Sequence, residues 1–511
     1  MFSSQDGRSL VRGARVALIV VGMTCSPARH LARPTVVTQI FAAPAEHPPV
    51  SETPLAPRTE RATCVYVNAR DDVSDRLLPV RVVLRGVAGT RDPEMDASFR
   101  GAGVHNVVVL AGGEGEVPVA PGHYEVTVSH GPEWSIVRER VAVQARRCGE
   151  VAARLRHVVP VARWTACDLH VHARPSYDAE VTVQNRVASL VAEGIEFALP
   201  SEHNLVGDYT PGVEALPVAA REAAGGHGLV WRPAVEVTTA RLGHFNIYPY
   251  FPGATPREGL PPLGATPREI FRAGRANNPA AIIQVNHPRM GRMGYFNRVG
   301  FNAMRNAGTH GGYDPGYDAI EVFNGFHLGA PARVDGVFRE WLTLLANGAR
   351  YVGTASSDSH TLAYRQAGYP RTYVYTPDRA GGGAPDADAL LRALRAGHAF
   401  GTSGPMLHAT IEDRIPGDTV VAREDAVTLR VRVEAAPWID VDRVEVYRNG
   451  ALERVLPVPV TSDVVRFDAA VRLPAARGYV VVVARGDAEM DAVLPTLHAR
   501  PFAFTNPIWI E

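Results

Sequence analysis

The 511-residue sequence predicts an α/β fold in which a barrel of repeated strand–helix units lies between two small β-sandwich domains. Two observations predict this organisation. Between about residues 160 and 404, apolar runs typical of strands alternate with amphipathic helical patterns, as in βα units around a mostly parallel sheet. On either side, at about 61–159 and 405–511, short strand patterns recur without helices, as in β-sandwiches. We therefore expect three folded domains.

The first 60 residues predict an export signal followed by a linker. Three arginines precede the short apolar run Val16–Met23, as in a secretory signal, and this run is too short for a transmembrane span. Cys25 follows, so residues 1–25 form either a signal peptide or a lipoprotein signal with a lipid anchor at Cys25, although Gly22–Thr24 is a poor lipobox. Residues 26–60 are proline-rich and aperiodic, which is typical of a disordered linker. We expect an exported, periplasmic protein; the alternative is a cytosolic protein with a disordered N-terminus.

Charge and cysteine content narrow the expected partners. The formal net charge is zero, so the composition gives no reason to expect nucleic acid or an anionic membrane as a partner. Export would permit disulfides, and Cys64 and Cys148, which bracket the first β-domain, are the expected pair. Cys167 is predicted to be a buried, unreactive thiol on a strand.

Strand-like segments fill the first predicted β-domain. Apolar residues alternate or cluster in Cys64–Val67, Val80–Leu84 and Val104–Leu110. The segment Val117–Val128 contains a Pro-Gly turn before an alternating strand, which is typical of short strands joined by tight turns. The histidines of this region show no mutual spacing, so we expect no active site there.

The central region is predicted to contain strands and helices in alternation. Val183, Val187, Leu190 and Val191 fall on one face of a helix, and Gly194 follows its end. The predicted elements, in order, are a strand at Val161–Cys167, a helix at Val181–Glu193, strands at Ile195–Leu199, Leu229–Val235 and His244–Pro249, a helix at Pro267–Ala276, strands at Ala280–Val285 and Tyr317–Phe323, a helix at Ala332–Ala346, strands at Tyr351–Ala355 and Arg371–Tyr375, and a helix at Asp386–Ala396. A closed barrel fits this number of strands.

The C-terminal region is predicted to be a second β-sandwich. Val427–Val433 and Arg443–Tyr447 alternate apolar and polar residues, and Val480–Val483 is a further strand. Asn449 and Gly450 supply a hairpin turn, because both residues adopt positive φ readily.

Polar side chains of the kinds that bind metal ions recur at the C-terminal ends of the central strands. The stretches Asp168–His172 and Ser357–His360 each carry two such residues at positions i and i+2, and this spacing points both side chains to one face of a strand. Active sites of α/β barrels form at this rim. The candidate metal ligands are His170, His172, Asp178, His203, Glu236, His244, His287, Asp358 and His360.

This ligand set predicts a cluster of metal ions. Imidazole and carboxylate together suit Zn, Mn or Fe, and nine ligands exceed the needs of one four-coordinate ion. We therefore expect two or three divalent ions, bridged by a carboxylate such as Glu236, with a metal-bound hydroxide as nucleophile and Asp358 or a ligand-bound water network as the candidate proton acceptor. The alternative, nine polar groups without metal, would require each to find hydrogen-bond partners at considerable cost. Asp178 and His244 rest on weaker strand predictions, and His244 could instead support a ligand.

Several short stretches together resemble the motifs of the PHP (polymerase and histidinol phosphatase) superfamily, and their residues are most similar to those of CehA/McbA-type metallohydrolases. The stretches are Asp168–His172, Ser201–Asn204, Ala234–Thr238, Gly243–Asn246, Asn286–Pro288, Ser356–His360 and Gly401–Pro405. The resemblance implies a distorted seven-stranded (β/α) barrel, up to three divalent ions, and hydrolysis of phosphoesters or of carbamate-like esters.

The resemblance also implies how the ligands are shared. The implied sets are His170, His172, Glu236 and Asp358 for one ion, Glu236, His244 and His287 for a second, and Asp178, His203 and His360 for a third. Glu202 stands where the superfamily usually has Asp, and we expect it to point away from the metals and orient a neighbouring imidazole.

Four residues near these motifs are candidates for substrate contact: Asn246, Asn286, Arg289 and Asn324. Arg289 could pair with a phosphate or carbonyl oxygen, and the alternative is an ordinary loop arginine. His310 and His327 are candidate proton donors, with solvated loop histidines as the alternative.

The function that this sequence predicts is a metal-dependent hydrolase that cleaves a phosphoester or a carbamate or carboxyl ester in a small-molecule substrate. Glu236 and Asp358 are its expected catalytic residues. The alternative is an exported carbohydrate- or surface-binding scaffold with a non-catalytic, metal-containing barrel, which the two β-rich flanks and the export signal suggest.

Overall fold

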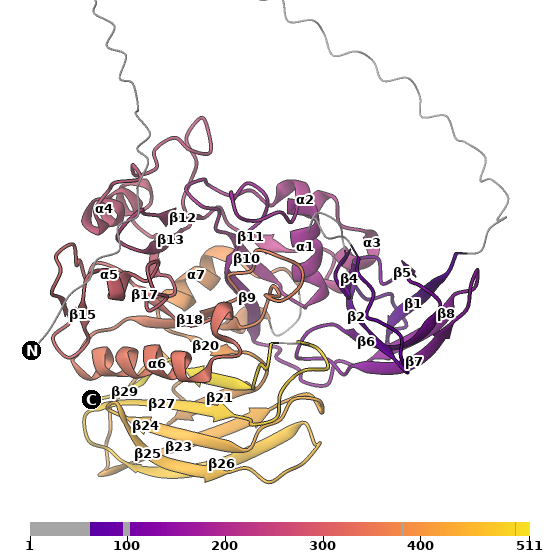
Figure 1. Cartoon of the computed structure of the whole chain (residues 1–511). Coiled ribbons are helices and arrows are strands. Elements are labelled where there is room, and N and C mark those ends of the chain that lie inside the picture. The colour runs from indigo at the N-terminus through magenta and orange to yellow at the C-terminus, as the bar shows by residue number, and fades with distance from the viewer. Residues whose placement is uncertain (1–61, 96–102, 380–382, 496) are drawn as a thin grey trace, which may run out of the picture. The chain divides into compact units, whose positions relative to one another are not determined.

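The computed structural model describes residues 62–95, 103–379, 383–495 and 497–511 (Figure 1). The described residues form one compact unit. The predicted signal, linker and lipid anchor at Cys25 lie outside the described residues. Among the helices that the structure describes, none has the length and apolar character needed to cross a membrane.

The N-terminal β-region consists of two sheets with an apolar core. Its strands are β1 (Cys64–Asp71), β2 (Val80–Val87), β3 (Gly103–Val104), β4 (Val107–Leu110), β5 (Glu114–Pro118), β6 (Gly122–Ser129), β7 (Val137–Val143) and β8 (Gly149–Leu155). The sheet orders are β5–β1–β8 and β3–β4–β2–β6–β7. Alternate residues of β1, such as Val65 and Val67, are fully buried, as expected for a strand with one face on a core. Cys64 and Cys148 form the disulfide that the sequence predicts, and Cys167 is a buried thiol.

Two larger sheets and one two-stranded sheet form the central region. The strands are β9 (Trp164–Val171), β10 (Phe197–Pro200), β11 (Val230–Trp231), β12 (Val235–Thr238), β13 (His244–Tyr248), β14 (Ile282–Val285), β15 (Phe301–Asn302), β16 (Ala307–Gly308), β17 (Ala319–Asn324), β18 (Val352–Ser356), β19 (Arg371–Tyr375) and β20 (Ala399–Thr402). One large sheet includes the order β11–β10–β9–β19–β20, the other runs β12–β13–β14–β17–β18, and β15 pairs with β16 in a sheet of two strands. Strands β10, β14, β17 and β18 are buried along their whole length, which is typical of strands covered on both faces.

Helices connect and cover these strands. They are α1 (Val183–Ala192), α2 (Thr210–Glu214), α3 (Val218–Ala223), α4 (Pro267–Asn277), α5 (Tyr295–Arg298), α6 (Pro331–Ala346) and α7 (Ala387–Arg395), with 3₁₀ turns at Gly325–His327 and Pro377–Arg379. Thr266 and Glu269 form a reciprocal capping box at the start of α4, which satisfies two of the free N–H groups there. Helix α6 packs its apolar stripe against β17 (Figure 1).

The structure differs from the sequence prediction in how the central strands are joined. Their ladders are not continuous: the sheets meet through single parallel bridges between Val171 and Ser359 and between His203 and Glu236, and β13 runs antiparallel to both neighbours. The predicted strand Leu229–Val235 is divided between the two sheets around Pro233, since proline cannot donate to a ladder. The described residues therefore show a mixed α/β, sheet-rich fold rather than a regular (β/α)7 barrel.

The C-terminal strands extend one of the central sheets. They are β21 (Met406–Ile411), β22 (Thr419–Val420), β23 (Ala426–Glu434), β24 (Arg443–Arg448), β25 (Ala451–Pro457), β26 (Val465–Pro474), β27 (Gly478–Arg485), β28 (Phe502–Thr505) and β29 (Ile508–Ile510). Strand β28 pairs with β20, so β28–β27–β24–β25 continues the sheet of β9 and β19. A separate sheet has the order β21–β23–β26. The predicted domain boundaries near residues 159 and 404 stay predictions.

The disulfide gives a first prediction. Replacing both Cys64 and Cys148 by alanine should lower the free energy of unfolding of the N-terminal sheets by about 2–5 kcal/mol, because the disulfide closes a long loop in the unfolded chain; the two cysteines are 84 positions apart. Denaturant unfolding followed by tryptophan fluorescence measures the difference. A reducing agent should bring the wild type to the stability of the variant and leave the variant unchanged. Equal stability of the oxidised wild type and the variant would contradict this prediction.

Candidate metal centre

The two stretches that carry paired ligands lie side by side at the ends of β9 and β18. The backbone N–H of Asp358 donates to the carbonyl of His170 at 2.7 Å, and that of His172 donates to the carbonyl of Ser359 at 3.0 Å. These bonds fix both stretches at one end of the sheet. Asp358 and His287 have φ values of +50° and +27°, a region that non-glycine residues rarely adopt and that often marks functional sites.

The first group of donor atoms is compact and fully enclosed. His170 Nε2 lies 3.2 Å from Asp358 Oδ1 and 3.5 Å from Glu236 Oε1, and His172 Nε2 lies 3.3 and 3.4 Å from the same two carboxylates. The two Nε2 atoms are 3.1 Å apart. A tetrahedral ion with metal–ligand distances of about 2.0–2.1 Å requires donor atoms about 3.3–3.4 Å apart. These five distances, 3.1–3.5 Å, bracket the spacing that a tetrahedral site requires.

The partners of the other ring nitrogens show which nitrogen faces the centre. His170 Nδ1 donates to the carboxylate of Glu321 at 2.9 Å, and His172 Nδ1 lies 3.1 Å from the hydroxyl of Ser176. That hydroxyl in turn donates to Glu202, so it accepts from His172. Both rings then direct Nε2 at the centre, where a divalent ion would accept both lone pairs; without an ion, a proton on His170 Nε2 allows a hydrogen bond to His172 Nε2.

A second donor group adjoins the first through Glu236. Oε1 of Glu236 lies 3.1 Å from His244 Nδ1 and 3.5 Å from His287 Nε2. Asn286 donates to the same Oε1 at 2.9 Å and fixes the carboxylate. All four side chains are buried. Glu236 thus lies between two sets of imidazoles, the position required of a bridging ligand.

A third group lies at the more open side of the centre. Asp178 Oδ2 is 3.3 Å from His203 Nε2, and Asp178 Oδ1 is 3.5 Å from His360 Nε2. The rings of His203 and His360 flank that of His172, with centroids 4.4 and 4.2 Å away. The Asp178 side chain is 40% exposed, so this group is the one in contact with solvent. The structure thus brings together all nine candidate ligands.

The charges of the centre shift its pKa values strongly. Burial lowers the pKa of His170, but the carboxylates of Asp358, Glu321 and Glu236 outweigh it and hold that pKa well above its ordinary value. Burial raises the pKa of Glu236, yet the surrounding imidazoles hold it well below its usual range. Without a metal ion, protons on the imidazoles compensate the buried carboxylates. A divalent ion would replace those protons, because a ligating imidazole must be neutral.

The donor set fits divalent metal ions on the observations of this structure. Buried groups that each offer one nitrogen or carboxylate oxygen to a common point include His170–His172–Glu236 and His203–Glu236–His244. No cysteine contributes to them, so nitrogen and oxygen are the donors. This chemistry suits Zn, Mn or Fe.

Glu202 acts on the centre through Ser176 rather than directly on an imidazole. Its carboxylate accepts from the backbone N–H of Ala173 at 3.0 Å and from the hydroxyl of Ser176. Ser176 connects it to His172 Nδ1 and also accepts from the backbone N–H of His203 at 3.0 Å. Burial raises the pKa of Glu202 to about 7. Glu202 therefore contacts the imidazole of His172 through Ser176, whereas the sequence analysis expected it to orient an imidazole directly.

The four candidates for substrate contact are engaged within the protein. Asn286 donates to Asn246 at 2.8 Å as well as to Glu236, and Asn324 donates to Asp358 Oδ2 at 3.0 Å. All three asparagines are buried, so they hold ligands in place. Arg289 donates to Glu340 and to the carbonyl of Phe301. The structure therefore places Arg289 in an ion pair and not at the centre.

Sequence reasoning missed three buried residues around the centre. Glu321 orients His170 and also accepts from the backbone N–H of His287 at 2.7 Å. Arg186, fully buried on α1, donates to the carbonyls of His172 and Ser359. Asp168 accepts from the backbone N–H and hydroxyl of Ser357. The sequence could have indicated Glu321, because it is the one charged residue within the apolar strand β17.

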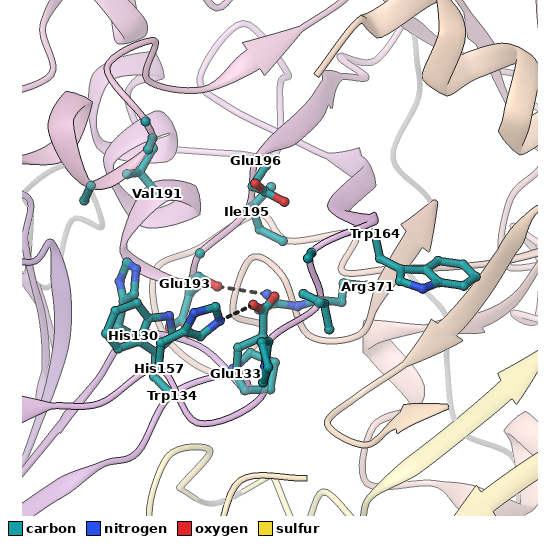
Figure 2. A pocket seen from close by; sticks show the side chains of 18 of the residues that line it. His130, Glu133, Trp134, His157, Trp164, Val191, Glu193, Ile195, Glu196 and Arg371 are labelled. Atoms are coloured by element: carbon teal, nitrogen blue, oxygen red, sulfur yellow. Dashed lines mark hydrogen bonds and ion pairs between the residues drawn. The ribbon is translucent and has the colours of Figure 1, made fainter. Parts of the chain in front are cut away.

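A cavity of about 410 Å³ lies elsewhere, at the amino end of β9 (Figure 2). Trp164, which lines it, is six residues before His170, or about 20 Å along a strand. The polar groups that line the cavity are bound within the protein. Glu133 accepts from His157 at 2.8 Å and from Tyr373 at 2.7 Å, and Arg371 donates to the carbonyl of Glu193 at 2.9 Å. This cavity contains none of the candidate ligands, so we assign it no part in the chemistry.

Comparison with known proteins adds little to this description. No protein-family model and no curated protein matches the chain. Among solved structures, a two-domain protein from Bacteroides vulgatus with a PHP-like metal-dependent phosphoesterase is 16% identical over 68% of this chain and 94% of its own, with a TM-score of 0.34. Endonuclease Q bound to an abasic duplex is 14% identical over 42% and 55%, with a TM-score of 0.28. An amidohydrolase from Chromobacterium violaceum is 16% identical over 45% and 96%, with a TM-score of 0.25. At these TM-scores the similarities carry no argument about fold or function.

The Glu202–Ser176 contact gives a prediction on metal affinity. Glu202→Gln places an amide where the carboxylate accepts two hydrogen bonds, so Ser176 no longer holds His172 in position. Zinc affinity should fall about 10- to 100-fold, as for other residues that orient a metal-binding histidine. Chelator competition measures it. Glu214→Gln on α2, an exposed position, is the matched control and should bind zinc like the wild type. Unchanged affinity in Glu202→Gln would refute the orienting role.

Proposed function

We propose that this protein is a metal-dependent hydrolase of the PHP type, similar to CehA/McbA metallohydrolases, that cleaves an ester or phosphoester bond in a small molecule. The observation that carries the proposal is the pair of buried Nε2 atoms of His170 and His172, 3.1 Å apart and enclosed by two carboxylates. Nine ligands in three groups around Glu236 would hold two or three divalent ions, with Zn, Mn or Fe as candidates.

The strand arrangement supports a distorted seven-stranded barrel as the fold of this hydrolase. The seven strands follow the order β10–β9–β18–β17–β14–β13–β12 when the bridge between Val171 and Ser359 is included. The bridge between His203 and Glu236 joins the two ends of that order. Both bridges lie at ligands or next to them, so the ring would close where the ligands converge.

The residues of the centre have separable roles in this proposal. Bound divalent ions would acidify water and offset the charge that develops on the substrate. Asn324 and Asn286 hold Asp358 and Glu236 in place through Oδ2 and Oε1. Asp358 Oδ1 faces the imidazoles and would bind the ion of the first group, so a network of ligand-bound water is the alternative acceptor for the proton released when water attacks. The enclosed imidazoles exclude bulk water from the first group, since His170 and His172 are fully buried.

Removal of single ligands tests this proposal. His170→Ala and Glu236→Ala should each lower hydrolysis of p-nitrophenyl phosphate or p-nitrophenyl acetate at least 1000-fold while leaving the far-ultraviolet circular dichroism unchanged. Each variant should also bind at least one divalent ion fewer by elemental analysis. A chelator should abolish wild-type turnover, and added zinc or manganese should restore it.

His123→Ala and Glu214→Ala, both exposed and outside the three donor groups, are controls that should keep wild-type rates. Wild-type turnover in His170→Ala or Glu236→Ala would reject the assignment. Metal binding without turnover of any ester, together with saturable polysaccharide binding, would favour the scaffold that the sequence left as an alternative.

We also propose that the protein is exported to the periplasm. The basic and apolar start of the chain and the Cys64–Cys148 disulfide support this location, because disulfides persist in oxidising compartments. Cell fractionation and mass spectrometry of the purified protein should find a periplasmic chain that lacks about its first 25 residues, lipidated if Cys25 is an anchor. A full-length chain in the cytosol would contradict the proposal.

A further inference from the structure

We propose that the cavity at the amino end of β9 binds a small primary amine, so that the protein has a ligand site separate from the metal centre (Figure 2). The cavity has a volume of about 410 Å³, within the range of about 300–1,000 Å³ that is usual for small-molecule sites. None of the nine candidate metal ligands lines it. The proposal therefore goes beyond the proposed function and does not depend on it.

Two regions of the chain form the cavity. The segment between β6 and β7 of the N-terminal β-region supplies His130, Glu133 and Trp134, whereas α1 and the residues after it supply Val191 and Ile195. Figure 2 shows these two groups of side chains on different sides of the cavity. Val191 and Ile195 are buried apolar side chains. They would accept the hydrocarbon part of a ligand, and junctions of this kind are common places for ligand sites.

His130 supplies a hydrogen-bond acceptor that the protein does not use. The residue is only 6% exposed, and its Nδ1 lies 2.6 Å from the carbonyl oxygen of Pro79. A carbonyl only accepts, so Nδ1 carries the ring proton. Burial lowers the pKa of His130 to about 4, so the ring is neutral and Nε2 keeps its lone pair. Among the described residues none donates to Nε2, and a ligand that binds there must donate.

Two carboxylates of the lining also favour a ligand that donates. Glu133 accepts from His157 Nε2 at 2.8 Å and from the hydroxyl of Tyr373 at 2.7 Å. Glu196, which is half-buried, accepts from the backbone N–H of Ala166 at 3.1 Å. An ionised carboxylate can accept at about four places, so both groups retain acceptor capacity.

The electrostatic field of the cavity favours a positive charge. Burial lowers the pKa of His157, but the carboxylate of Glu133 outweighs it and, with a smaller contribution from Glu196, holds that pKa above its ordinary value. The C-terminus of α1 also lies at the cavity through Glu193, and the end of a helix where carbonyls are free carries a partial negative charge. A cation is therefore stabilised at this wall.

Arg371 is the single arginine in the described lining, and it does not reverse this preference. Its guanidinium donates to the carbonyls of Gly368 and Glu193 at 2.7 and 2.9 Å, and the residue is buried. The carboxylate of Glu193 pairs with Arg81. These groups serve the packing of the junction, so Glu133 and Glu196 remain as the more accessible charged groups.

The need for both donors and positive charge selects the ligand class. A primary ammonium group carries three N–H donors and a positive charge. An alcohol donates once and has no charge, and a quaternary ammonium ion has the charge without donors. A carboxylate cannot donate and is repelled by Glu133 and Glu196. A primary amine with an apolar body therefore matches the acceptors, the field and the apolar side chains together.

Four probes with one aromatic ring test the ligand class. Calorimetry with metal-loaded full-length protein should show that phenethylamine binds about tenfold or more tightly than 2-phenylethanol, 3-phenylpropionate or N,N,N-trimethylphenethylammonium, because only the primary amine combines charge with N–H donors. A chelator should leave the affinity for phenethylamine unchanged, since the site lies apart from the metal ions.

Two variants locate the site. Glu196→Gln removes the charge but keeps an oxygen for the N–H of Ala166, and it should raise the dissociation constant of phenethylamine about tenfold. His130→Asn keeps a donor for the carbonyl of Pro79 and removes the Nε2 acceptor, and it should raise the constant about fivefold. Glu150→Gln, an exposed position on β8 outside the lining, is the control and should bind the amine like the wild type.

Each outcome either supports or overturns the amine site. Absence of phenethylamine binding, or equal or tighter binding of any of the other three probes, would overturn the ligand class. Unchanged amine affinity in Glu196→Gln, or in folded His130→Asn, would place the binding elsewhere, as would loss of binding on addition of the chelator. Glu196→Gln decides the matter even if His130→Asn does not fold. Ester hydrolysis is not used as a readout, so the proposed function stands or fails independently.

Discussion

Two imidazole nitrogens that face each other set the main constraint on this structure. His170 and His172 are fully buried and present Nε2 atoms 3.1 Å apart, with the carboxylates of Glu236 and Asp358 within 3.5 Å. Burying such groups without a cation between them is costly. Much of the surrounding fold keeps the groups in this arrangement, through the backbone bonds between β9 and the Asp358 stretch and through Arg186, which holds both stretches by their carbonyls.

The polar residues around the centre form a supporting layer rather than a binding surface. Asn246, Asn286 and Asn324 are buried and donate to backbone or to carboxylates, and Glu202 reaches His172 through Ser176. Each bond removes a rotational freedom from a ligand before any ion binds, and this preorganisation sharpens the geometry that a metal meets. The more open side of the centre is the third group, where Asp178 lies.

The sequence predicted those parts of the structure that depend on local pattern. Apolar spacing located α1 and α6, and the i, i+2 spacing brought His170 and His172 onto one face. It did not predict that β28 pairs with β20, because pairing between distant strands leaves no mark in local periodicity. It also proposed Arg289 for substrate contact, since a sequence does not show which arginine has a carboxylate partner. Glu321 was passed over although a charge within an apolar strand indicates a buried polar contact.

The central claim is that divalent ions occupy the space between these donor atoms, and anomalous diffraction from crystals of the metal-loaded protein tests it most directly. Data collected at the zinc, manganese and iron absorption edges should show a peak about 2.0–2.2 Å from the Nε2 atoms of His170 and His172 and from oxygens of Glu236 and Asp358. Absence of any anomalous peak among these four side chains, with the two imidazoles turned apart, would contradict the account.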